Sequence, residues 1–168
     1  MKLISVLLSA ALTTTLVSTC VSAPNAAHVS AVDHPEASPF DTDLALVAQD
    51  AVDDALATAA ATGKHAMIVM GANWCHDSRA LAGWFETPRF ETMLRESYIV
   101  RYIDVGQKDR NIDVAQRFGL ENIVGTPTVI VTNARGEVLN LDSAVTWRHS
   151  ASLTEDEIFE AFVELAAQ

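Results

Sequence analysis

Cysteine is scarce in this 168-residue sequence, which has only Cys20 and Cys75. Two cysteines, one of them close to the amino terminus, cannot form the internal disulfide framework typical of small secreted domains. Basic residues are also few, since 11 Lys and Arg stand against 22 Asp and Glu and leave a net charge of −11. Such an acidic chain repels nucleic acid and anionic membranes, so nucleic-acid binding is disfavoured. Beyond the amino terminus, no run approaches the roughly 20 apolar residues that a membrane span needs.

The amino terminus, residues 1–22, is predicted to be a signal peptide because Lys2 precedes an uncharged run of apolar and small residues. We therefore expect an exported protein, located in the bacterial periplasm. Val17-Ser18-Thr19-Cys20 partly resembles a lipoprotein box. Two alternatives follow: lipidation of Cys20 with a lipid anchor as the only membrane contact, or ordinary cleavage at Cys20 or Ser22 and a soluble product.

Residues 23–41 contain three prolines and no periodic apolar pattern, so a flexible linker is predicted there. His28 and His34 lie in this segment, and no nearby cysteine or third histidine completes a ligand set. We therefore predict no metal site and no cofactor. Residues 42–168 have the length of one domain with a real core.

Within that domain, apolar periodicity and turn residues predict alternating helices and strands. Strands are expected at 67–70 and 98–104, and a hairpin at 128–132 with 137–141. Helices are expected from Leu44 to Gly63, from Cys75, from Pro88 after the N-cap Thr87, over 107–118, and after a capping box at 154–157. This order predicts an α/β fold with a central mixed β-sheet and helices on both faces.

Cys75 lies where the apolar strand ending near Gly71 gives way to a helix. A helix start presents free N–H groups and a partial positive charge, which favour thiolate over thiol, and thiolate is the reactive form. The alternative is an ordinary buried cysteine that behaves as a small hydrophobe.

The sequence resembles the thioredoxin family over residues 44–167, on the basis of two motifs. The first is Trp-Cys-His-Asp-Ser at 74–78, and the second is Gly-Thr-Pro-Thr at 125–128, which is followed by an apolar strand. The resemblance implies a thioredoxin-like fold, with Cys75 facing a cis-proline at Pro127. The sequence departs from the family at two positions. Ser78 stands where the second, resolving cysteine usually lies, and Val69 replaces a buried acid that the family associates with that cysteine.

Site residues follow from this resemblance. Cys75 is the expected catalytic nucleophile, and Ser78 either hydrogen-bonds the thiolate, caps a helix turn, or only records the loss of the redox pair. His76 either stabilises the thiolate when protonated or is a surface side chain. The expected substrate groove comprises Trp74, His76, Thr126 and Pro127, with the Thr126 backbone offered to an extended segment.

The sequence therefore predicts a monothiol thiol-disulfide oxidoreductase or isomerase that forms mixed disulfides through Cys75. Its partners would be disulfide- or thiol-containing proteins, or small thiols such as glutathione. The alternative is a redox-inactive binding module that retains the thioredoxin groove and uses it to bind proteins.

Overall fold

The computed structural model describes residues 33–41 and 48–168. The predicted signal peptide, His28 and the Cys20 alternatives lie outside the described residues. Among the helices that are described, none has the length and hydrophobicity needed to traverse a bilayer.

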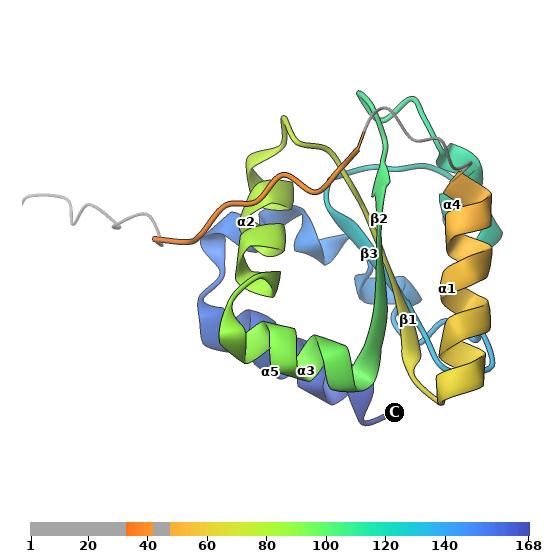
Figure 1. The fold of residues 1–168 in the computed structure, drawn as a ribbon. Helices are drawn as coiled ribbons and strands as arrows, with labels where there is room; N and C mark the ends of the chain where they lie inside the picture. Colours follow the sequence, from red (N-terminus) through yellow and green to blue (C-terminus); the bar gives the residue numbers. More distant parts are fainter. Residues whose placement is uncertain (1–32, 42–47) are drawn as a thin grey trace, which may run out of the picture. The chain divides into compact units, whose positions relative to one another are not determined.

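The centre of the fold is a mixed three-stranded sheet in the order β2-β1-β3 (Figure 1). The middle strand, β1 (His65–Gly71), pairs in parallel with β2 (Tyr98–Asp104) and antiparallel with β3 (Thr128–Thr132). Every residue of β1 from Ala66 onward is buried. A strand covered on both faces has a continuous apolar sequence rather than an alternating one, which is the pattern found here.

Helices cover both faces of the sheet, as the sequence predicted (Figure 1). Alternate side chains of β1 point to opposite faces. Ile68 and Met70 pack under α1 (Ala48–Thr62) and α4 (Ile112–Arg117), whereas Met67 and Val69 pack against the other helices. Those helices are α2 (His76–Phe85), α3 (Pro88–Ser97) and α5 (Glu155–Ala166), with 3-10 turns η1 (Leu141–Ser143) and η2 (Thr146–Ser152) before α5.

Two predicted helix starts are confirmed in position. Thr154 and Glu157 form the reciprocal capping box that opens α5, and Pro88 follows the N-cap Thr87 of α3. The helix predicted over 107–118 is shorter, because α4 begins only at Ile112. Asn111 adopts a left-handed conformation (φ 53°), and its side chain donates a hydrogen bond to the Asp104 carbonyl, which holds the preceding residues in a loop.

The hairpin predicted for 128–132 with 137–141 is wrong in its second half, where the described chain has only an isolated bridge between Thr132 and Val138. The Asn140 side chain replaces the strand at this point. Its amide oxygen accepts from Val131 N at 2.8 Å, and its amide nitrogen donates to Val129 O at 2.8 Å. An asparagine side chain carries one acceptor and two donors, so it can imitate a neighbouring backbone.

The described part of the predicted linker, 33–41, is not a flexible tether but a segment packed along α2, and we call it the strap (Figure 1). Phe40 is 1% exposed, and its backbone N–H and carbonyl both bond the Asn73 side chain. Ala37 N donates to Arg79 O at 3.1 Å. The boundary predicted at residue 42 is therefore corrected, because core-forming residues begin before it.

Gly83 allows the strap to approach α2. Replacing Gly83 with alanine is therefore expected to push the strap away from the helix. A Cβ at position 83 would lie 2.3 Å from the Pro35 carbonyl oxygen, which is backbone. Alanine in a helix otherwise stabilises by about 0.5–1 kcal/mol over glycine, whereas overpacking costs about 1–3 kcal/mol. We expect Gly83→Ala to lower the urea midpoint and expose the strap to proteolysis. If Gly83→Ala raised the urea midpoint and left the strap resistant to proteolysis, this contact would be contradicted.

Candidate functional site

Cys75 lies at the corner between β1 and α2, as the N-cap residue of that helix, with an extended backbone (φ −84°, ψ 122°). Its backbone N–H donates to Ala72 O at 3.0 Å, and its carbonyl accepts from Arg79 N at 3.1 Å. The chain therefore turns tightly after the buried strand and starts a helix at the cysteine. The open N–H groups of the first helical turn follow directly after the sulfur-bearing residue.

The loop at 125–128 lies against this corner. Cys75 Sγ donates a hydrogen bond to the Thr126 carbonyl oxygen at 3.2 Å, across 51 residues of sequence. The Thr126–Pro127 peptide bond is cis. The Cys75 side chain is free and the residue is 8% exposed, so the site is largely covered but not closed to solvent. The structure thus brings together Cys75, Thr126 and Pro127.

Ser78 lies behind the cysteine in the first turn of α2 and is fully buried. Its hydroxyl has no hydrogen-bond partner within the described part of the chain, so here it neither caps a helix turn nor bonds the Cys75 sulfur. Side chains at an N-cap and three residues later face each other across a helix start. A Cβ at Gly71 would lie 2.7 Å from Ser78 Oγ, which means that this glycine leaves room for the hydroxyl.

Trp74 is 49% exposed, so its ring does not fill the core. Its indole Nε1 donates to Gly106 O at 2.7 Å and fixes the ring beside the loop that follows β2. Val124, just before the proline loop, is 60% exposed. Two large apolar side chains are therefore exposed on the segments that carry Cys75 and Thr126.

His76 does not act alone at the surface. Its Nε2 lies 2.7 Å from His34 Nε2 and 3.8 Å from Glu36 Oε1, both on the strap. The sequence alone does not indicate this partner of His34, because 42 residues separate the two histidines and the prolines of the strap predict a flexible segment. The hydrogen bond from Arg79, together with the Arg79 charge, holds the pKa of Glu36 below its usual value.

Asp77 is a positioning residue that sequence reasoning missed. Its Oδ1 accepts a hydrogen bond from Ala151 N at 3.0 Å and so ties the start of α2 to η2. A carboxylate at a helix start also suits the partial positive charge there. Asp77 lies inside the motif, but nothing local in the sequence indicates a partner 74 residues away.

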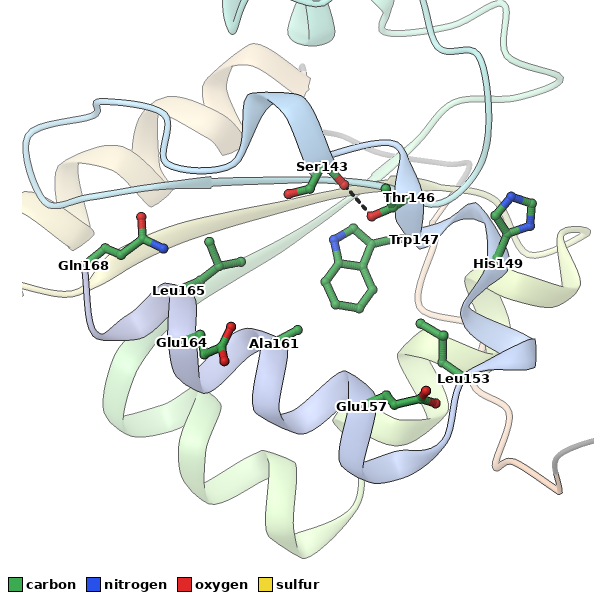
Figure 2. A pocket seen from close by; sticks show the side chains of 10 residues that line it. All are labelled: Ser143, Thr146, Trp147, His149, Leu153, Glu157, Ala161, Glu164, Leu165 and Gln168. Carbon is green, nitrogen blue, oxygen red and sulfur yellow. Dashed lines mark hydrogen bonds between the residues drawn. The ribbon is translucent and has the colours of Figure 1, made fainter.

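A separate apolar hollow of about 500 Å³ lies between η2 and α5 (Figure 2). Trp147, Leu153 and Leu165 line it, and Glu157 and Glu164 stand at its side. None of the site residues predicted from the sequence lines this hollow. The Trp147 ring stacks on Phe162 at 4.3 Å between centroids, so Trp147 is mainly a core residue.

Comparison with known proteins agrees with this fold. A thioredoxin-like family model matches residues 32–134, which is more than half of the chain, and the chain belongs to the thioredoxin-like family. The match begins at the strap rather than at α1, in agreement with the corrected boundary. No curated protein matches the sequence.

Among solved structures, the chain is similar to a disulphide isomerase from Xylella fastidiosa Temecula1, with 29% identity and a TM-score of 0.69. That match covers 77% of this chain and 97% of the other. A Pseudomonas aeruginosa protein of unknown function matches at 16% identity and a TM-score of 0.39, over 71% of this chain and 76% of its own. The identity and the TM-score of the Pseudomonas match are too low to support an argument.

Proposed function

We propose that this protein is a thiol-disulfide oxidoreductase of the monothiol type, which works chiefly as an isomerase. The observation that carries the proposal is the hydrogen bond from Cys75 Sγ to the carbonyl beside Pro127, at the start of α2. A sulfur held at a helix start, next to a backbone that can pair with an extended segment, suits attack on a protein disulfide. The similarity to the Xylella disulphide isomerase supports the same chemistry.

The reaction starts from the Cys75 thiolate, which attacks one sulfur of a substrate disulfide. A bond forms between Cys75 Sγ and that sulfur, the substrate disulfide breaks, and the other substrate sulfur leaves as a thiolate. Ser78 offers a hydroxyl where a resolving thiol would stand. Release therefore needs a second substrate cysteine, which restores Cys75 and gives an isomerised substrate without net oxidation, or an external thiol such as glutathione.

The exposed Trp74 and Val124 would contact the substrate on either side of the sulfur. These side chains also favour the second candidate function, a redox-inactive module that binds proteins in the same groove. A protein partner captured equally by the wild type and by Cys75→Ala would favour the binding module. Capture that depends on the thiol favours the exchange enzyme.

Ser78→Cys provides the sharpest test of the monothiol mechanism. We expect glutathione disulfide to leave a long-lived adduct on Cys75 of the wild type, detected by intact mass. In the Ser78→Cys variant that adduct is expected to resolve at least about 100-fold faster, because an intramolecular thiol reacts at a very high effective concentration. Ser78→Ala is the matched control and should keep the adduct. Absence of any adduct on the wild type would contradict the proposal.

We further propose that the protein is exported to the bacterial periplasm, an oxidising compartment in which disulfide exchange has substrates. The basis is the amino-terminal sequence, with Cys20 either lipidated or lost with the signal. The intact mass of the protein recovered from the producing cells distinguishes the lipidated form from the soluble one. Recovery of the full unprocessed chain from the cytoplasm would contradict export.

A further inference from the structure

His34, Glu36 and His76 place three ligand-type side chains within reach of one point beside the catalytic corner. One nitrogen of each imidazole and one carboxylate oxygen all lie within 4.8 Å of one another. His34 and Glu36 come from the strap, whereas His76 is the first residue of α2. The His76 and Glu36 side chains are 60% and 44% exposed, so an ion and its water ligands can reach them.

The two imidazoles approach each other through their Nε2 atoms, which lie only 2.7 Å apart. One of these nitrogens must be an unprotonated acceptor, because two N–H groups cannot face each other at that distance. His34 Nδ1 lies 3.2 Å from the Pro35 carbonyl oxygen, an acceptor that requires the proton on Nδ1. In neutral His34, Nε2 is therefore the unprotonated acceptor of this pair, and its lone pair accepts the His76 Nε2–H that a metal ion would displace. A histidine fixed by a carbonyl at one nitrogen and open at the other is the usual state of a metal ligand.

We propose that His34, Glu36 and His76 form a binding site for a divalent transition-metal ion, with zinc as the best-suited ion. Two imidazoles and one carboxylate are a known zinc ligand set that leaves a fourth position for water or another small ligand. Hard ions such as magnesium prefer all-oxygen sites and should not bind here. The two Nε2 atoms would move apart to about 3.3 Å, the separation that tetrahedral Zn–N bonds of about 2.0–2.1 Å require. His76 is exposed and His34 is partly buried, so this small shift would fall mainly on the His76 ring.

Arg79 competes for the same carboxylate. Its guanidinium donates to Glu36 at 3.2 and 3.4 Å, and it also donates to the Asn73 carbonyl. The ion would therefore share Glu36 with a cation, so the carboxylate should contribute less to affinity than either histidine. The bound ion would join the strap to the start of α2, one residue after Cys75. This site does not depend on the exchange chemistry proposed above.

The test is calorimetric titration of zinc into the full chain after treatment with a chelator, at neutral pH. We expect one zinc per chain, and at least about 10-fold weaker binding in His34→Ala and in His76→Ala, since even ligand-supporting residues have effects of that size. Glu36→Gln should weaken binding less. His149→Ala is the matched control, because His149 is exposed and lies outside the cluster, and it should bind as the wild type does.

A second readout separates ligand loss from misfolding. Zinc is expected to raise the melting temperature of the wild type and of His149→Ala, because an ion that binds only the folded state stabilises it. That rise should be smaller in His34→Ala at the same zinc concentration. Equal zinc affinity in the wild type, His34→Ala and His76→Ala would overturn the proposal. Loss of binding in Cys75→Ala alone would assign the ion to the thiol and would overturn it as well.

Discussion

Replacing Cys75 with alanine is expected to abolish formation of mixed disulfides completely. Cys75 is the free cysteine of the described chain, and its thiol is the group that lies against the Thr126 carbonyl. No other side chain at this corner can form a disulfide. The measurement is the intact mass after incubation with glutathione disulfide, together with recovery of activity of a scrambled disulfide-bonded substrate. Both signals should fall to the level of buffer alone.

Cys20→Ala, compared in the unprocessed full-length chain, is the matched control for this loss, because in that form Cys20 is the other cysteine of the sequence. The Cys20→Ala variant is expected to keep the adduct and the isomerase signal. The fold should persist in Cys75→Ala, since a small apolar side chain replaces a buried thiol. If Cys75→Ala retained the adduct and Cys20→Ala lost it, the site would be misassigned.

Replacing Phe162 with alanine is expected to cause the largest loss of stability, about 3–5 kcal/mol of unfolding free energy. Phe162 is fully buried on the inner face of α5. Its ring stacks on Trp147 and meets Phe85 edge-on at 5.3 Å between centroids. Removing it would leave a cavity between α5, α2 and η2. Urea unfolding measures the loss as a lower midpoint at an unchanged slope.

Val163 is the neighbouring residue and gives the control, since it is 43% exposed. Val163→Ala is expected to change stability by no more than about 0.5 kcal/mol, the usual range for surface substitutions. Equal losses for the two variants would mean that the energy resides in helix propensity of α5 rather than in packing of the Phe162 ring.

The three strands of the sheet and the two helix starts could be predicted because their signals are local. β1 follows from a run of buried apolar residues, and α5 follows from a capping box that Thr154 and Glu157 complete within one turn. The Cys75 corner could also be located, since the strand, the turn and the helix start are consecutive in sequence. Each of these features depends on neighbours fewer than about ten residues away.

The remaining features depend on partners far away in sequence. Nothing in the sequence around Asn140 distinguishes it from an ordinary turn residue. Its side chain nevertheless bonds the backbone of both Val129 and Val131, as a neighbouring strand would. The strap lacks periodicity because most of its contacts are with other segments: Ala37 bonds Arg79 of α2, and Phe40 bonds Asn73. Its prolines predict an irregular backbone correctly, but irregular is not the same as mobile, and only the packed structure distinguishes the two.

The position of Phe40 matters for any truncation of this chain to its regular helices and strands, because this buried residue precedes α1. Its ring rests on the backbone at Gly71, where an added Cβ would come within 2.6 Å of it, and it meets Tyr102 edge-on. The Phe40 ring therefore fills a space beside the sheet, although Phe40 itself lies outside every strand. A shortened version that starts at α1 would therefore carry an aromatic-sized void directly behind the turn that leads to the sulfur.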